Sequence, residues 1–272
     1  MRWKDIENRS ERENVTPKMT FRETLQKAIL TSFSKEGLFQ NIVFQGGTAL
    51  RLFHDNPRYS EDLDFVLREN QGSIKIANFL KKTRDFIAYS YPFLEEVETR
   101  TQKAESDLQR YIIKTTSENL DQAVRINIEL FDIPSYLNET KILTFSPFQP
   151  VVRVEKPEEI LVDKVTALSG RKYIKGRDLW DIYFLTEQKD LSVDLPLLLK
   201  KIKDYDMNES DLINELTNIG PRLEKEGKDI LDRELKRFLP PSLYQYYHGD
   251  LDTILTSVDK VAKDVLSRGG SH

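Results

Sequence analysis

Two aspartates separated by one residue are the side chains of this sequence best suited to chemistry. Asp62 and Asp64 lie in the stretch YSEDLDFVL. Because side chains alternate along a strand, both carboxylates point to the same face. Magnesium prefers oxygen ligands, and it commonly takes one or two carboxylates together with phosphate oxygens of a substrate. The spacing therefore predicts a divalent-cation site at the start of a strand.

A glycine pair precedes these aspartates. Gly46 and Gly47 follow an apolar segment at 42–45 and lead into Thr48. Glycines allow a backbone to approach a phosphate closely, and the N-terminus of the next helix favours negative charge. A glycine pair alone is typical of turns, and an acidic pair alone is common on solvated surfaces. Their combination, with apolar segments on both sides, favours a site for Mg²⁺ and a nucleotide.

The elements that position these residues follow from hydrophobic spacing. Apolar residues at helical intervals predict a helix over 20–39, which should pack behind a strand over 42–45. A short helix over 48–53 and a second strand over 63–67 then carry the glycines and the aspartates. Further expected elements in this half of the chain are a helix over 74–89 and strands over 111–115, 124–130 and 151–154.

Four prolines between residues 134 and 157 indicate a connector, and the sequence beyond residue 156 is helical in its pattern. We therefore expect an α+β protein, with an α/β domain over 1–155 and a helical domain over 156–272. The helices expected in the second domain span 158–168, 177–187, 195–203, 209–219, 227–238 and 251–266.

Composition restricts the function classes. The chain has 272 residues, 39% hydrophobic and 32% charged, and a net charge of −4, so nucleic acid could bind only to a local basic patch. The absence of cysteine excludes disulfides and thiolate metal sites, and the three histidines are too scattered to form a metal cluster. The polar N-terminus and the lack of a long apolar run predict a cytoplasmic protein without membrane contact.

The stretch GGTALR, followed by RYSEDLDF, resembles the AbiEii/AbiGii toxin family within the DNA polymerase β-like nucleotidyltransferase superfamily. The resemblance extends over roughly residues 20–190. It implies a nucleotidyltransferase fold, a mixed sheet with flanking helices, and a helical domain that contributes Lys and Asp side chains to the cleft. It also implies that Asp62 and Asp64 bind Mg²⁺ or Mn²⁺ and are catalytic.

A third carboxylate in this superfamily lies on a strand beside the acidic pair. Glu129 occupies that position, in a segment whose polar and apolar residues alternate. Glu129 is therefore a candidate metal ligand. The alternative is that it belongs to an ordinary solvated sheet face.

The helical half contains a second block, LVDKVTALSGRKYIKGRDLWDIYFL, that is similar to the family's second motif. Its candidate residues are Lys164, Arg171, Arg177, Asp178 and Asp181. Helical spacing puts Lys164 and Arg171 on one side of a helix, and makes the two aspartates neighbours. Lysine and arginine suit a triphosphate, and an aspartate could accept the proton of the reacting hydroxyl or orient the lysine. The structural alternatives are an ion pair between Arg177 and Asp181 and a helix cap at Asp178.

The resemblance also implies that Gly46, Gly47, Thr48 and Ser60 bind the nucleotide. In the family, the serine two positions before the first metal aspartate lies beside the triphosphate. Arg58 could neutralise phosphate charge, or it could pair with Glu61 at the surface.

Three enzymatic or binding functions remain open from the sequence. The preferred one is transfer of a nucleotidyl group from a nucleoside triphosphate (NTP) to a hydroxyl acceptor. The resemblance implies that this acceptor is RNA, at the 3′ end of tRNA, and that the protein is a toxin with a separate antitoxin protein or a role in phage defence. The second keeps the site but modifies a hydroxyl of a protein (NMPylation) or of a small molecule. The third is a non-catalytic nucleotide-binding regulator or antitoxin. Candidate RNA-contact lysines are Lys81, Lys82, Lys172, Lys175, Lys200, Lys201 and Lys203.

Overall fold

The computed structural model describes residues 1–72 and 74–269, and contacts between Cα atoms divide the chain into two units. The first unit comprises residues 1–55 and 59–155, and the second comprises residues 56–58 and 156–272. The short loop Asn56–Arg58 thus groups with the helices although it lies early in the sequence.

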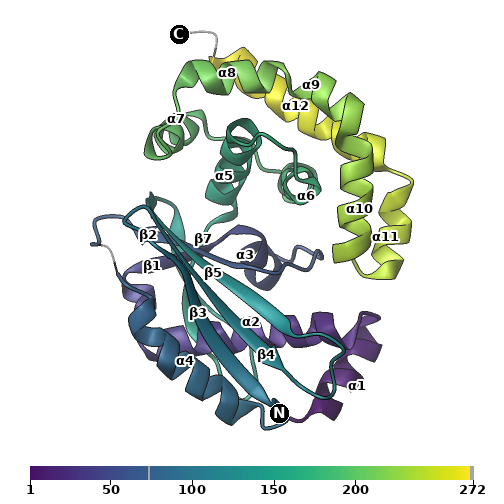
Figure 1. Cartoon of the computed structure of the whole chain (residues 1–272). Helices are drawn as coiled ribbons and strands as arrows, with labels where there is room; N and C mark the ends of the chain where they lie inside the picture. Colours follow the sequence, from purple (N-terminus) through teal and green to yellow (C-terminus); the bar gives the residue numbers. More distant parts are fainter. Residues whose placement is uncertain (73, 270–272) are drawn as a thin grey trace. The chain divides into compact units, whose positions relative to one another are not determined.

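The first unit is built on a seven-stranded mixed sheet with the order β3-β4-β5-β2-β1-β7-β6 (Figure 1). The strands are β1 (Ile42–Gln45), β2 (Leu63–Arg68), β3 (Glu96–Ala104), β4 (Leu108–Thr116), β5 (Val124–Ser135), β6 (Asn138–Ile142) and β7 (Val151–Glu155). Two neighbouring pairs, β2 with β5 and β1 with β7, are parallel, and the others are antiparallel. This mixed sheet confirms the expected α+β class.

Four helices belong to the first unit: α1 (Trp3–Glu13), α2 (Pro17–Lys35), α3 (Gly46–Phe53) and α4 (Ala77–Ser90), and a short 3₁₀ turn spans Leu38–Gln40. Figure 1 shows α2 and α4 against the sheet, and α2 contacts both β5 and β7. The core on that side includes Phe33, Phe44 and Phe65, all fully buried, with the rings of Phe44 and Phe65 5.3 Å apart. Burial of such aromatic surface holds α2 to the sheet.

An ion-pair network holds α2 against α1 and α3. Glu23 of α2 is buried and accepts charged hydrogen bonds from Arg9 of α1 and Arg51 of α3, the latter at 2.9 Å. Lys27 lies 2.9 Å from the same carboxylate. Burial would raise the pKa of Glu23, but Lys27, Arg51 and Arg9 lower it to about 2. This charged contact anchors the short helix that follows the glycine pair.

The second unit is helical. It contains α5 (Pro157–Gly170), α6 (Gly176–Tyr183), α7 (Leu195–Asp204), α8 (Glu209–Thr217), α9 (Ile219–Arg222), α10 (Lys228–Phe238), α11 (Pro241–His248) and α12 (Leu251–Gly269), with π-helical turns at Phe184–Gln188 and Leu223–Gly227. Helix α5 packs on α6, α7 and α8, and α6 packs on α10 and α12. Trp180 of α6 is fully buried among these helices.

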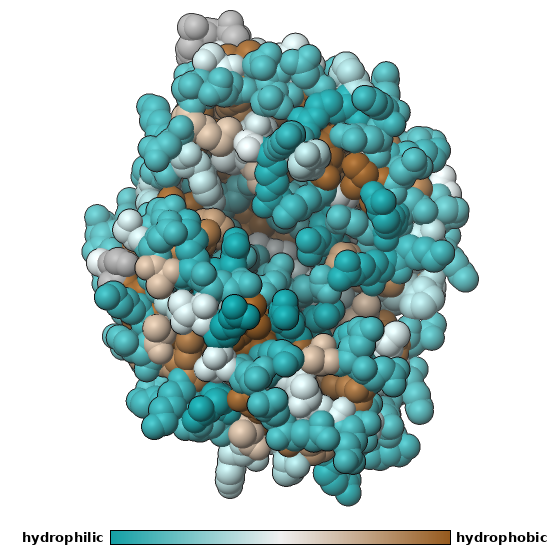
Figure 2. Space-filling model, in the orientation of Figure 1, coloured by the Kyte–Doolittle hydropathy of each residue, from teal (hydrophilic) through white to brown (hydrophobic). Residues whose placement is uncertain are grey.

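The face in Figure 2 is mainly hydrophilic, with hydrophobic side chains in small separate patches. None of the helices that the structure describes is long and apolar enough to cross a membrane.

Candidate active site

The two aspartates stand at the beginning of β2. Asp64 lies within the strand and Asp62 directly precedes it, and both are partly exposed. Asn127 of the neighbouring strand β5 donates from its amide nitrogen to Oδ1 of Asp62 at 2.8 Å. The Thr48 hydroxyl donates to the backbone oxygen of Asp62 at 2.5 Å. Thr48 therefore links the start of α3 to the backbone that carries the first aspartate.

The backbone of Gly46 shows why this position requires glycine. Its φ of +77° lies in the left-handed region that glycine adopts without steric cost. A Cβ atom at this residue would lie 2.7 Å from Oδ2 of Asp64, because Gln45 pairs directly with Asp64 across β1 and β2. The first glycine of the pair thus leaves space for the second aspartate.

Replacing Gly46 with alanine is therefore expected to displace the Asp64 carboxylate and to strain the turn by about 1–2 kcal/mol. We expect nucleotidyl transfer to fall at least tenfold, with a small decrease in thermal stability. Gly249→Ala is a matched control, since a Cβ there has no neighbour within 4 Å. Unchanged transfer by Gly46→Ala, measured with labelled triphosphate, would contradict the proposed role of this turn.

The third candidate carboxylate lies next to the pair. Glu129 of β5 is the direct register partner of Asp64 of β2, so both side chains point to one face of the sheet. Arg110 of β4 donates from Nε to Oε1 of Glu129 at 2.7 Å. Within the described residues, no group of three or more His, Cys, Asp or Glu side chains is placed to hold a metal ion. The geometry thus brings Glu129 beside Asp64 but engages it with an arginine.

Ser60 lies two residues before Asp62 and is partly exposed. Its backbone oxygen accepts a hydrogen bond from the Gln26 side chain at 3.1 Å, which ties this loop to α2. Its hydroxyl has no hydrogen-bond partner among residues 1–72 and 74–269. The hydroxyl is therefore available to a ligand.

Asp181 of α6 is the centre of a buried charge cluster in the second unit. Arg58 donates to it twice, from Nε at 3.0 Å and from Nη2 at 2.8 Å, and Lys164 of α5 lies 2.9 Å away. Asn56 also donates to this carboxylate at 3.0 Å and accepts from the Trp180 indole at 2.9 Å. Asp181 and Arg58 are both almost completely buried. Arg58 is therefore buried and held by Asp181 of α6, and it does not lie at the surface as the alternative pairing with Glu61 assumed.

A second carboxylate shares Lys164. Asp178, also on α6, accepts from Lys164 Nζ at 2.8 Å and from the Arg171 guanidinium. Burial would lower the pKa of Lys164, but Asp178 and Asp181 raise it above its ordinary value. Burial would likewise raise the pKa of each aspartate, but Lys164 with Arg171 lowers that of Asp178, and Arg58 with Lys164 lowers that of Asp181. Lys164, Asp178 and Asp181 are thus each held in the charged form.

In this region the structure contradicts one sequence-based expectation, for Arg171, and two of the structural alternatives, for Arg177 and Asp178. Helix α5 ends at Gly170, and Arg171 is extended, with φ −104° and ψ 134°, so it does not continue the helical face of Lys164. Arg177 lies 3.4 Å from Glu234 of α10 and does not pair with Asp181. Asp178 pairs with Lys164 and Arg171 and does not cap α6, whose N-cap is Lys175. Helical spacing could not predict these contacts, because they depend on the turn after α5 and on the packing of neighbouring helices.

Two further polar residues complete these sites and were not predicted to contact the candidates. Asn127 was visible only as one of the polar positions on an alternating strand, and its contact with Asp62 depends on the pairing of β2 with β5. The sequence around Asn56 indicated only a turn, through the dipeptide Asn56-Pro57. Their partners lie 65 and 125 residues away in the sequence.

Comparison with known proteins decides the family. The sequence model described as "Nucleotidyl transferase AbiEii toxin, Type IV TA system" matches residues 28–257. The chain belongs to the AbiEii nucleotidyltransferase family. This confirms the resemblance found in the sequence, and the enzyme class is that of a nucleotidyltransferase.

Solved structures agree with this fold. The chain is similar to JHP933 from Helicobacter pylori, with a TM-score of 0.55 and 19% identity, over 93% of this chain and 94% of that one. A second H. pylori structure has the same TM-score and identity, over 93% of this chain and 97% of that one. At this level of identity the likeness concerns the fold alone. No curated protein sequence matches the chain significantly.

Proposed function

We propose that this AbiEii-family protein transfers a nucleotidyl group from an NTP to a hydroxyl of an RNA acceptor, such as the 3′ end of tRNA, as the toxin of a toxin–antitoxin pair. The observation that carries the proposal is that Asp64 and Glu129 are register partners on one sheet face, that Asp62 directly precedes the same strand, and that Gly46 leaves room for the Asp64 carboxylate. The family description supports the toxin role and a cognate antitoxin protein.

The donor set on β2 fits a hard divalent cation. Asp62 and Asp64 offer carboxylate oxygens that are partly exposed, and Mg²⁺ or Mn²⁺ would complete its coordination with phosphate oxygens and water. Such a cation, when bound, polarises the reacting phosphorus and stabilises the attacking and leaving oxygens. Glu129 is proposed as the third ligand, which would require its carboxylate to exchange its bond with Arg110 for the cation.

The nucleotide is proposed to bind at the first turn of α3. Gly46 and Gly47 present backbone amides at the N-terminus of this helix, where negative charge is favoured. Ser60 supplies a hydroxyl that could donate to a phosphate oxygen, and Thr48 keeps the backbone of Asp62 in place. The binding of phosphate and the placement of the carboxylates thus depend on the same short segment.

For the helical unit we propose that the basic side chains bind the triphosphate and that the two aspartates orient Lys164. Lys164 retains 13% side-chain exposure and a raised pKa, so it can present a permanent positive charge to the triphosphate. Arg171 and Arg177, whose side chains are partly exposed, are proposed to donate hydrogen bonds to the phosphate oxygens. Asp178 and Asp181 would then act by orienting Lys164 and keeping it charged, in addition to any proton transfer.

The acceptor is proposed to meet the loop between α5 and α6. This loop carries Arg171, Lys172 and Lys175, and Arg177 follows in the first turn of α6. Tyr173 is 70% exposed, and Lys172 lies 5.3 Å from the centre of its ring. Cations next to an exposed aromatic ring suit a single-stranded nucleic acid, whose phosphates bind the cations while a base stacks on the ring. Lys201, in contrast, is buried against Glu159 at 2.6 Å and cannot contact RNA.

Replacing Lys172 and Lys175 together with alanine is expected to weaken RNA binding and to reduce the slope of log K against log salt by about one for each phosphate that is no longer bound. NTP binding should change little. Filter binding at several salt concentrations measures the slope. Lys225→Ala with Lys236→Ala removes the same charge from exposed sites of α10 and its preceding turn and serves as the control. Equal slopes for both double variants would reject this loop as the RNA contact.

Incubation with each labelled NTP, Mg²⁺ and total RNA or total protein tests the proposed function directly. Label in RNA supports it. Label in protein alone, or in a small molecule alone, would instead support modification of those hydroxyls. The absence of label in every fraction, with intact NTP binding, would favour a non-catalytic regulator. Activity with Mn²⁺ in place of Mg²⁺ defines the cation.

A further inference from the structure

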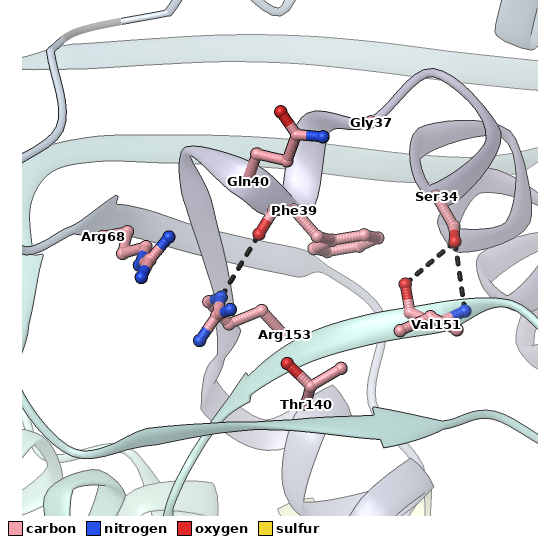
Figure 3. A pocket seen from close by; sticks show the side chains of 8 residues that line it. All are labelled: Ser34, Gly37, Phe39, Gln40, Arg68, Thr140, Val151 and Arg153. Carbon is pink, nitrogen blue, oxygen red and sulfur yellow. Dashed lines mark hydrogen bonds between the residues drawn. The ribbon is translucent and has the colours of Figure 1, made fainter.

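A pocket of 270 Å³ lies at the end of the sheet away from the aspartates. It is lined by Ser34, Gly37, Phe39, Gln40, Arg68, Thr140, Val151 and Arg153, all within the first unit (Figure 3). In the antiparallel pair of β1 and β2, Gln45 and Asp64 are partners at one end and Ile42 and Leu67 at the other. Arg68 follows Leu67, so the pocket and the carboxylates occupy opposite ends of these strands.

Two arginines without acidic partners face this pocket. No carboxylate of the described residues lies within ion-pair distance of Arg68 or Arg153. Among residues 1–72 and 74–269, Arg153 donates to neutral acceptors, the Phe39 carbonyl at 3.3 Å from Nε and Asn138 Oδ1 at 3.0 Å from Nη1. Two adjacent cations with no counter-charge are unusual in a protein of net charge −4, in which most arginines are paired.

The electrostatics of Arg153 agree with this geometry. Partial burial and, next, the positive charge of Arg68 lower the pKa of the Arg153 guanidinium below its ordinary value. The two guanidinium groups therefore repel each other in the unliganded protein. An anion between them would relieve that repulsion and gain charged hydrogen bonds.

Neutral donors complete the lining. The Gln40 amide and the Thr140 hydroxyl have no hydrogen-bond partner within the described part of the chain. Thr140 is the register partner of Arg153 across β6 and β7, so their side chains share one face. Ser34 is already used, since it donates to the Val151 carbonyl at 2.8 Å and accepts from its amide at 3.1 Å.

We propose that this pocket binds a phosphate monoester. Arg68 and Arg153 would donate charged hydrogen bonds to the doubly charged phosphate, and Gln40 and Thr140 would donate further hydrogen bonds to it. A dianion matches two guanidinium charges, whereas the diester of a nucleic-acid backbone carries a single charge. The volume of the pocket lies just below the range of sites for drug-sized ligands, so it suits a small phosphorylated molecule. The site is separate from the proposed triphosphate site and does not depend on it.

Calorimetric titration of the full chain with inorganic phosphate and with a 5′-mononucleotide, without divalent cation, tests the proposal. Asp62→Asn is used as the parent protein, so that turnover does not interfere. We expect saturable binding that Arg68→Gln with Arg153→Gln weakens by about tenfold or more. Arg100→Gln with Lys81→Gln removes the same charge from exposed positions elsewhere in the first unit and should leave the affinity unchanged.

The two possible sources of phosphate are distinguished by a dinucleotide without a terminal phosphate, which carries only a diester. Preference for the monoester supports the proposal, and preference for the diester overturns it. Equal affinity in the parent and the Arg68/Arg153 double variant also overturns it, as does a parent that binds no phosphate at millimolar concentration. When Arg68→Gln and Arg153→Gln are introduced together into the wild-type chain instead, nucleotidyl transfer is expected to be retained, because these substitutions lie at the opposite end of β2 from Asp64.

Discussion

Replacing Asp62 or Asp64 with asparagine is expected to lower nucleotidyl transfer by about 10²- to 10³-fold or more, the range found when a group that stabilises transition-state charge is removed. An asparagine cannot supply the negative charge that holds a divalent cation beside the triphosphate. The change should appear in single-turnover transfer of label from an NTP at saturating acceptor. It should also weaken the dependence of activity on Mg²⁺ concentration.

The fold should survive both substitutions. Asparagine at position 62 retains an oxygen that can accept from the Asn127 amide, and both positions are partly exposed, so no cavity is opened. Removing one of two neighbouring carboxylates also relieves charge repulsion. Asp121→Asn, on an exposed loop of the same unit, is the control. Full activity of either purified variant would exclude that residue as a cation ligand.

Substitution of Glu129 distinguishes a metal site in which this residue is a ligand from one in which it only supports Arg110. Where Glu129 binds the cation, Glu129→Gln should approach the loss seen for Asp64→Asn, since the two residues are register partners. Where Glu129 serves only to hold Arg110, with its Nε at 2.7 Å, Glu129→Gln and Arg110→Gln should have similar small effects. Comparing these variants separates a ligand from a supporting ion pair.

The buried strands were predictable because their apolar pattern is local. Strand β1 begins and ends at the predicted residues, and the alternating segment from Val124 forms β5. The edge strand β3 (Glu96–Ala104) was missed, since its residues are mostly polar and exposed and it is defined by pairing with β4. The other edge strand, β6 (Asn138–Ile142), lies in the segment interpreted as a connector, for the same reason.

Helical boundaries show the same limit. Helix α1 (Trp3–Glu13) is mainly polar and buries few side chains, among them Ile6, so its sequence carries little periodic signal. Helix α11 (Pro241–His248) buries none completely. The expected helix over 20–39 instead begins at Pro17, where Thr16 caps it, and ends at Lys35 before a turn at Gly37. A threonine cap followed by proline was a readable start that the apolar spacing did not reveal.

The acidic pair and the glycine turn could be found from sequence because they lie within 19 residues of each other, from Gly46 to Asp64. The buried cluster could not be assembled in this way. Arg58 and Asp181 are 123 residues apart, and nothing in the local pattern of either residue indicates the other. The motif identified Lys164 and Asp181 as important, but only the packing of α5, α6 and the loop Asn56–Arg58 shows that they share one charge network.

Replacing Asp181 with alanine is expected to destabilise the helical unit by about 3–5 kcal/mol, the cost of breaking a buried ion pair on one side. Arg58 and Lys164 would remain in a buried environment, and Asn56 would lose an acceptor at 3.0 Å. For a protein of this size the unfolding temperature should fall by about 10 °C. Thermal unfolding followed by circular dichroism measures the change, and Asp181→Asn should lose less because its amide oxygen still accepts from Arg58.

Lys164→Met should behave differently, and the contrast assigns the roles. Without Lys164, Asp181 keeps both hydrogen bonds from Arg58, and Asp178 keeps its contact with Arg171, so no charge is left unpaired. We therefore expect a smaller loss of stability than for Asp181→Ala, together with a loss of transfer of about tenfold or more at a temperature where the variant is folded. An Asp181→Ala protein with unchanged unfolding temperature but no transfer would instead place Asp181 in the chemistry, and a fully active Lys164→Met protein would confine Lys164 to the structural network.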